Sequence, residues 1–428
     1  MEAGMKNLKR NLLVAILAIV SILCVAFAAG CSAPKGSLIG LKFSEYDDHY
    51  VVYGIGSTRD TDIIIPSEYG NKPVTKIAAF SFERRHDLTS VKIPESVTEI
   101  DELAFRNCSV LTIYCEAKSK PEGWEENWNE GCPVVWDCKN NDVAEDGYIY
   151  TYIDGIRYAL KDGEATVVTQ SNSISVNVAI PKTVKYKKNS YTVTAIGDNA
   201  FDIQTNVNTL RVYIETITLP DSITTIGNYA FYETYWLSDF TIPSGVISIG
   251  DYAFSHCLKM ESITIPESVK SIGVGTFEWS GLKRVTISSN ITQIPEKAFA
   301  SCIALNNVTI PNGVTSIGDG AFSFCSDLTS ITIPDKVTSI GDAAFYCCGF
   351  TSITLPDGIT SIGDNMFNGC RGLTSITIPK GVTSIGNSVF FECDALEDVY
   401  FGGTADEWDK ITIGYNNSNL TDATIHYN

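Results

Sequence analysis

Leu328-Thr-Ser-Ile-Thr-Ile-Pro-Asp-Lys-Val-Thr-Ser-Ile-Gly-Asp-Ala-Ala-Phe-Tyr-Cys-Cys348 is the clearest copy of a unit that fills the C-terminal half of this 428-residue chain. The unit returns every 22 or 23 residues, as the prolines that close its first strand show: Pro220, Pro243, Pro266, Pro311, Pro334, Pro356 and Pro379. Self-similarity at this period predicts a solenoid, in which each unit buries its apolar face only against its neighbours. Such a fold favours a binding role over catalysis.

Each unit reads as two short extended segments and a turn. Ile331 and Ile333 share one face by the period of two, and the proline after them ends the strand. Asp342 is placed to cap a short helical turn that carries Phe345. Identical residues stack when units stack, so a core ladder is predicted from these phenylalanines: Phe201, Phe231, Phe254, Phe277, Phe299, Phe322, Phe345, Phe367 and Phe390.

The repeat is interrupted once, which predicts two capped arrays. A short array spans residues 38–140, with Phe80 and Phe105 closing its two clearest units, and residues 116–138 read as its C-terminal cap. Residues 141–147 are polar and turn-rich, as expected of a linker. A long array with its own caps spans residues 148–428. The fold class is therefore a mainly β solenoid with short helical turns.

The N-terminus reads as an export signal. Lys6, Lys9 and Arg10 precede an apolar run over residues 12–29, and small residues lead into Cys31. This resembles the lipobox of bacterial lipoproteins, which implies a signal peptide over residues 1–30, lipidation of Cys31 and a tether over residues 31–37. Ala28 stands where that motif usually has leucine. An uncleaved transmembrane anchor is the alternative, and both place the rest of the chain outside the cytoplasm.

Composition argues against several functions. With 31 basic and 50 acidic residues, the net charge is −19, whereas nucleic-acid binding needs a basic surface. The four histidines are far apart in sequence and form no zinc motif. The chain shows no nucleophile–base pair and no phosphate-binding loop. We expect no enzyme activity, no cofactor, no metal site and no nucleic-acid partner.

Seven of the thirteen cysteines lie three residues after a ladder phenylalanine: Cys108, Cys257, Cys302, Cys325, Cys348, Cys370 and Cys393. A small buried side chain explains this position, because a thiol packs as a small hydrophobe. Disulfides between neighbouring units are the alternative in an exported chain. Cys132 and Cys138 in the first cap are the better candidates for a disulfide.

The unit is similar to the BspA-like leucine-rich repeats of bacterial surface proteins. Trp124, Trp128 and Trp136, and the ending from Phe401 through Trp408, also look like terminal segments of that group. The resemblance covers nearly the whole chain after the signal. It implies a leucine-rich repeat fold, surface display and adhesion to matrix proteins or cells, and it carries no catalytic motif.

Departures from the repeat are the candidates for partner binding, because stacking does not require them. Aromatic and arginine residues are the usual anchors of interfaces. The candidates are Tyr235, Trp236, Asp239, Trp279, Lys283 and Arg284. The sequence therefore predicts a lipid-anchored surface protein or adhesin that engages an extracellular protein or glycan. The alternative is a structural, self-associating envelope protein without a host ligand.

Overall fold

The computed structural model describes residues 41–55, 60–139, 143–154, 156–170, 176–202 and 214–428. The chain divides into two compact units, Met1–Gly147 and Tyr148–Asn428. The predicted signal peptide, the tether and Cys31 lie outside the described residues. Among the residues that the structure describes, none forms a helix long and apolar enough to cross a membrane.

The first unit is a short β solenoid. Its first strands form the parallel sheet β3-β6-β8-β9, and its second strands join β1 and β2 in the sheet β1-β2-β5-β4, with β7 paired to β5. The strands are β1 (Leu41–Glu45), β2 (Tyr50–Ile55), β3 (Asp62–Ile64), β4 (Glu68–Tyr69), β5 (Lys72–Ile77), β6 (Ser90–Ile93), β7 (Glu99–Ile100), β8 (Thr112–Cys115) and β9 (Val134–Val135).

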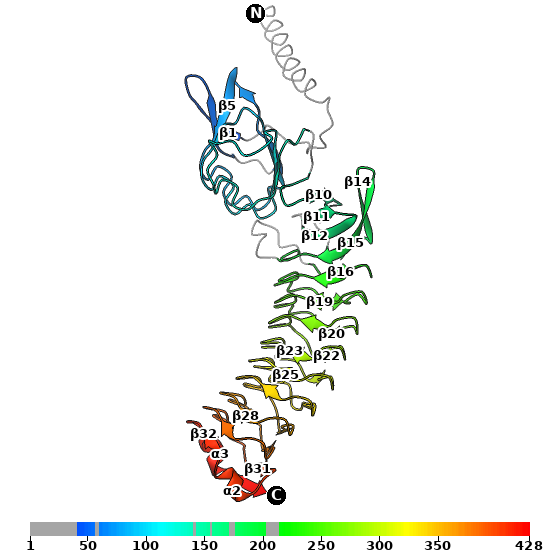
Figure 1. Ribbon diagram of the computed structural model, residues 1–428, viewed down its shortest axis with the longest axis vertical. Helices are drawn as coiled ribbons and strands as arrows, with labels where there is room; N and C mark the ends of the chain where they lie inside the picture. Colours follow the sequence, from blue (N-terminus) through cyan, green and yellow to red (C-terminus); the bar gives the residue numbers. More distant parts are fainter. Residues whose placement is uncertain (1–40, 56–59, 140–142, 155, 171–175, 203–213) are drawn as a thin grey trace, which may run out of the picture. The chain divides into compact units, whose positions relative to one another are not determined.

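The second unit begins with antiparallel strands and continues as stacked coils, seen from β16 to β32 in Figure 1. The opening strands are β10 (Ile149–Ile153), β11 (Ile156–Lys161), β12 (Glu164–Gln170), β13 (Asn177–Ala179), β14 (Thr183–Tyr186) and β15 (Asn189–Ile196). The first strands of the later coils are β16 (Thr216–Thr218), β18 (Asp239–Phe240), β20 (Ser262–Thr264), β22 (Arg284–Thr286), β24 (Asn307–Thr309), β27 (Ser352–Thr354), β29 (Ser375–Ile378) and β31 (Asp398–Phe401).

The second strands of these coils are two residues long and repeat the same sequence. Equal residues lie opposite each other in parallel register, as Ser316 does with Ser339 and Ile317 with Ile340. These strands are β17 (Thr225–Ile226), β19 (Ser248–Ile249), β21 (Ser271–Ile272), β23 (Gln293–Ile294), β25 (Ser316–Ile317), β26 (Ser339–Ile340), β28 (Ser361–Ile362) and β30 (Ser384–Ile385). Neither row of strands forms one continuous sheet. Strands β17, β19 and β21 extend the opening strands into an eight-stranded sheet, and the later strands form separate sheets of three or four strands.

The predicted phenylalanine ladder is confirmed. All nine rings from Phe201 to Phe390 are fully buried, and each stacks on the next with centroids 5.1–5.9 Å apart. Such offset stacking adds to the hydrophobic gain of burying a large aromatic side chain. The ladder thus holds consecutive coils at a fixed spacing.

The predicted helical turn is wrong. The segment around Phe345 is a run of turns, with left-handed residues on both sides at Ala343 (φ +53°) and Cys347 (φ +53°). The N–H groups of these three residues donate to carbonyl oxygens of the next coil at 2.8–3.1 Å. The same pair of left-handed residues flanks Phe231, Phe254 and most other ladder rings. Because these N–H groups point along the solenoid, the backbone cannot continue as a helix.

Asp342 also has a different role from the predicted helix cap. Its Oδ1 accepts a hydrogen bond from the backbone N–H of Asp364 at 2.9 Å, and its own N–H donates to Oδ1 of Asp319 at 2.9 Å. Each carboxylate therefore bridges to the following coil. The bond recurs where the accepting side chain is Asp198, Asn228, Asp251, Asp364 or Asn387. We call this set the Asx ladder.

The cap of the first unit is a divergent coil. Trp128 takes the ladder position after Phe105, with ring centroids 5.9 Å apart, and Val134–Val135 pairs with β8. The ladder residue before Phe105 is Phe82, fully buried and stacked at 4.8 Å, and the sequence-based choice of Phe80 was wrong. Phe80 is instead a left-handed, 43% exposed turn residue.

The C-terminal cap of the second unit follows the same principle. It contains two short helices, α2 (Ala405–Trp408) and α3 (Ser418–Asp422), and the strands β32 (Thr412–Ile413) and β33 (Thr424–Tyr427). Strand β32 pairs with β30 and β33 pairs with β31, both in parallel register. The cap thus continues both sheets while its helices replace the usual turns.

The ladder cysteines are buried thiols that also donate hydrogen bonds. Sγ of Cys348 donates to the carbonyl oxygen of Phe322, one coil back, at 3.1 Å. Equivalent bonds are made by Cys108, Cys257, Cys302, Cys325, Cys370 and Cys393. Thr234, which replaces the cysteine in its coil, donates through its hydroxyl to Phe201 at 3.5 Å. The position therefore selects a small donor and not only a small hydrophobe.

The structure does not contain the disulfide suggested for Cys132 and Cys138, because both are thiols in it. Each lies beside a different cysteine of the preceding coil. Sγ of Cys132 donates to the carbonyl oxygen of Cys108 at 3.5 Å. The backbone N–H of Cys138 donates to the carbonyl oxygen of Cys115 at 2.9 Å.

Candidate functional site

One surface of the second unit collects side chains that the core does not use. It is formed by the turns around the ladder rings, and we call it the turn face. Its side chains come from the left-handed residues two positions before and after each ladder phenylalanine from Phe231 to Phe390, and from the residue just after it. These positions vary widely: the residue two before the ring is Tyr252, Lys297, Gly320 or Ala343 in different coils. The backbone geometry therefore does not require a particular side chain there.

Five aromatic side chains form a continuous row on the turn face, which we call the aromatic row. Ring centroids are 5.1 Å apart between Tyr229 and Tyr252, 5.4 Å between Tyr229 and Tyr232, 5.5 Å between Tyr232 and His256, and 6.0 Å between His256 and Trp279. Trp279 is 47% exposed and Tyr229 is 36% exposed. The row thus offers the large, rigid contact area on which interfaces commonly depend.

Four of these rings stand on left-handed backbone, which is unusual for bulky residues. The φ angles are +54° at Tyr229, +52° at Tyr252, +61° at His256 and +57° at Trp279. This conformation costs about 1 kcal/mol or more per residue and persists only where its surroundings hold it. Here the N–H groups of the four residues donate to the next coil at 2.8 Å. The solenoid therefore fixes the direction of each ring.

Two tyrosine hydroxyls of the row, those of Tyr232 and Tyr252, stay protonated at neutral pH. Partial burial, followed by the negative charge of Glu233, raises the pKa of Tyr232. Partial burial and then Glu278 raise the pKa of Tyr252. Burial likewise raises the pKa of Glu278 itself. The hydroxyl of Tyr252 can therefore donate a hydrogen bond to a partner.

The six residues predicted from sequence do not come together in one site. Trp279 belongs to the aromatic row. Trp236 is 43% exposed, and Nζ of Lys259 lies 5.6 Å from its ring centroid. The hydroxyl of Tyr235 donates to the carboxylate of Glu233 at 2.6 Å.

The other three predicted residues lie in the first strands of their coils or directly before one. Asp239 and Arg284 are exposed in β18 and β22, two coils apart. Nζ of Lys283 pairs with the carboxylate of Glu261 at 2.7 Å, so its charge is already matched. The set predicted from sequence did not include the other four members of the row, Tyr229, Tyr232, Tyr252 and His256. Their position relative to the ladder phenylalanine was the signal that could have identified them.

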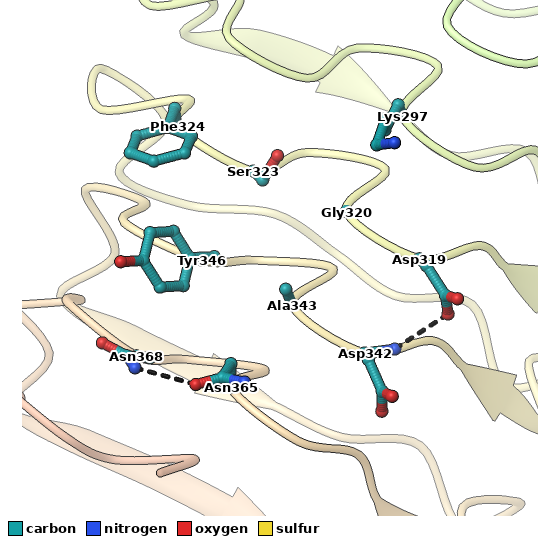
Figure 2. Close-up of a pocket in the computed structure, with 10 residues that line it drawn as sticks. All are labelled: Lys297, Asp319, Gly320, Ser323, Phe324, Asp342, Ala343, Tyr346, Asn365 and Asn368. Atoms are coloured by element: carbon teal, nitrogen blue, oxygen red, sulfur yellow. Dashed lines mark hydrogen bonds between the residues drawn. The ribbon is translucent and has the colours of Figure 1, made fainter.

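Further along the turn face lies an open groove of about 520 Å³ (Figure 2). Gly320 and Ala343 form its floor, and Phe324 and Tyr346 stand at one side with ring centroids 5.0 Å apart. Asn365 lies in the following coil, so the groove crosses several coils. Among the residues that the structure describes, no group of three or more His, Cys, Asp or Glu side chains is arranged to hold a metal ion.

The repeat and its geometry agree with the BspA type leucine-rich repeat region, which matches the chain in six copies over residues 59–122, 194–312 and 292–421. These ranges cover more than half of the chain. The chain belongs to the BspA-type leucine-rich repeat family.

Solved structures of leucine-rich repeat proteins are also similar to it. A leucine-rich repeat protein from Bacteroides ovatus has 28% identity and a TM-score of 0.49, over 65% of this chain and 78% of that chain. A leucine-rich cell surface protein from Faecalibacterium prausnitzii has 26% identity and a TM-score of 0.37, over 62% of this chain and 97% of that chain. A comparison with curated proteins gives no match.

Proposed function

We propose that this chain is a lipid-anchored bacterial surface protein that binds an extracellular protein or glycan through the turn face of its second unit, without catalysis. The aromatic row carries the proposal. It places five rings in contact on the turn face, and two of them, Tyr229 and Trp279, are more than a third exposed.

Other coils support this reading because they keep the fold without rings at the same positions. Ala343 takes the position of Tyr252 with φ +53°, and Ser301 takes the position of Trp279 with φ +57°. Stacking therefore does not explain the row. Exposed aromatic clusters of this kind mark interaction sites more often than they stabilise a monomer.

Location at the surface rests on the N-terminal signal and on the family. Lipidation of Cys31 would supply two acyl chains, which is enough for stable anchoring. We expect Cys31→Ala to abolish palmitate labelling and to leave the precursor unprocessed. Cys24→Ala, in the apolar run of the signal, is the matched control and should keep full labelling. Labelling that survives Cys31→Ala would exclude lipidation at that residue.

Binding is tested with the full chain on an array of matrix proteins and glycans. The double variant Tyr252→Ala/Trp279→Ser copies residues that other coils already hold on left-handed backbone, so it should fold normally. We expect it to weaken binding at least tenfold. Ile303→Ala is the control, because Ile303 is 54% exposed and lies outside the row. Equal binding by wild type and the double variant would remove the row from the interface.

Self-association is the competing outcome. If the partner were a second copy of this chain, sedimentation would depend on protein concentration and the double variant would sediment as a monomer. A wild-type protein that stays monomeric over a wide concentration range would argue against a structural envelope role.

A further inference from the structure

We infer that the groove beside the aromatic row is a binding site for a neutral oligosaccharide. The inference rests on the proposed binding function and names a ligand class for one part of the turn face. It is carried by the groove's floor, its aromatic side and its polar side, which differ from those of the neighbouring coils.

The hollow exists because two consecutive coils carry the smallest side chains at the same position. Gly320 and Ala343 stand where earlier coils carry Tyr252, Gly275 and Lys297, all on left-handed backbone with φ between +52° and +58°. The Tyr252 ring lies over Gly275, whereas no ring covers Gly320. The missing side chains leave a volume of about 520 Å³, within the usual range for small-molecule sites. Its length across several coils suits a chain of sugar units.

One side of the groove is aromatic. Phe324 is 49% exposed on left-handed backbone, and its ring meets that of Tyr346 edge to face at 5.0 Å. A pyranose ring presents a flat face of C–H groups, which packs against an exposed aromatic ring. Partial burial raises the pKa of Tyr346, so its hydroxyl remains a donor at neutral pH.

The remaining sides offer both hydrogen-bond donors and acceptors (Figure 2). Nδ2 of Asn368 donates to Oδ1 of Asn365 at 3.0 Å, and this bond uses only one polar atom of each amide. Asp319 and Asp342 use Oδ1 in the Asx ladder, which leaves Oδ2 as a further acceptor on each. Ser323 adds a hydroxyl. Sugar hydroxyls are both donors and acceptors, so this mixture fits them.

Charge and depth disfavour other ligands. Lys297, which lines the groove, is paired with Glu296 at 3.0 Å, and the two aspartates of the lining make the site slightly acidic. Nucleic acids and sulfated or acidic glycans are therefore disfavoured. A protein partner would use a deep apolar pocket for an anchor side chain. The floor of Gly320 and Ala343 provides none, whereas sugars bind across shallow surfaces.

The test uses the full chain in a detergent that lacks a sugar headgroup. The probes are glucan, mannan, galactan, xylan and chitin oligosaccharides of three to six units, with affinity measured by calorimetry. We expect at least one to bind and Phe324→Ala to weaken it about tenfold. Ala343→Tyr copies Tyr252 at the same left-handed position and fills the groove, so we expect it to abolish binding. Phe391→Ala is the control and should bind like wild type, because Phe391 is 44% exposed but does not line the groove.

Two results would overturn the inference. One is that no oligosaccharide of the panel binds, and the other is that Ala343→Tyr binds as wild type does. Neither result contradicts the wider proposal, which concerns the aromatic row. That proposal fails separately, when Tyr252→Ala/Trp279→Ser leaves partner binding unchanged.

Discussion

A single methyl group at Gly341 would collide with the neighbouring coil. A Cβ atom there would lie 2.1 Å from Oδ1 of Asp319 and 2.5 Å from its backbone nitrogen. The glycine before each Asx residue is therefore required for close approach, and its role in a turn is secondary. At the residue scale, the fold depends on how closely the backbone and side chains of neighbouring coils approach each other.

We expect Gly341→Ala to lower the free energy of unfolding by about 1–3 kcal/mol, because the coils must separate to admit the methyl group. Denaturant unfolding followed by circular dichroism measures this. Gly372→Ala is the matched control, since its Cβ would meet only the carbonyl oxygen of Phe350 at an ordinary 3.4 Å. Equal destabilisation by both variants would contradict the role assigned to Gly341.

The buried thiols make stability depend on alkaline pH. Burial raises the pKa of Cys302 and of Cys393 to about 12, above the usual value near 9. Below pH 9 each thiol is protonated in both states, so its contribution to stability is fully present. Between pH 9 and 12 the unfolded chain loses the proton first, and stability falls by about 1.4 kcal/mol per pH unit and thiol.

The measurement compares wild type with Cys302→Ser, because serine does not titrate in this range and Ser280 and Thr234 occupy the same position in other coils. We expect the free energy of unfolding of the wild type to fall more steeply between pH 9 and 10.5. Parallel pH profiles for the two proteins would show that the Cys302 thiol contributes nothing.

At the scale of the element, the turn is an inter-coil connection. The Asx ladder, the left-handed N–H groups and the thiol bonds all join one coil to the next. Each strand of the stacked coils from β16 on is only two to four residues long. The turns therefore contribute much of the hydrogen bonding that strands supply in longer sheets.

We expect Asp342→Ala to destabilise the second unit by about 1 kcal/mol, because the N–H of Asp364 loses its acceptor. Asp342→Asn should be close to neutral, since Asn228 and Asn387 make the same bond. Thermal unfolding of both variants tests this. The two variants must differ, and equal melting temperatures would refute the Asx ladder as a stabilising feature.

Strand positions and the core ladder could be predicted from sequence because they follow a strict period. The turn could not. Gly341-Asp342 before an Ala-Phe pair has the composition of an N-capped helix, and nothing local reveals that its N–H groups bond to another coil. Phe80 is a second example. No glycine marks this turn, so the sequence does not show whether Phe80 or Phe82 takes the ladder position. Only the stacking of Phe82 on Phe105 identifies it.

At the scale of the whole molecule, stability is a sum over neighbouring coils. Deleting residues 312–334 removes one period and joins Pro311 to Asp335 in register. We expect a folded, shorter protein. Its free energy of unfolding, and the slope of that free energy against denaturant concentration, should both fall by roughly the contribution of one coil. Circular dichroism and small-angle scattering measure the outcome. Loss of all folded structure would be incompatible with this architecture.

The candidate site was only partly predictable at this scale. Trp279 was found because it breaks the repeat, whereas the groove arises from the absence of side chains at Gly320 and Ala343. Small residues at a variable position carry no signal in one sequence. Whether such small residues leave a groove depends on which larger residues lie beside them in the neighbouring coils. Only the structure of the coils shows these neighbours.

The bonds between coils also have a mechanical consequence. A chain pulled from its ends would lose its terminal coil first, because that coil has a neighbour on one side only. Each loss releases about 23 residues, or about 80 Å of extended chain, before the next coil bears the load. A protein that is anchored at one end and bound to a partner through its turns would therefore lengthen stepwise under a pulling force. Unfolding of each coil would absorb part of the work, so less force would reach the anchor.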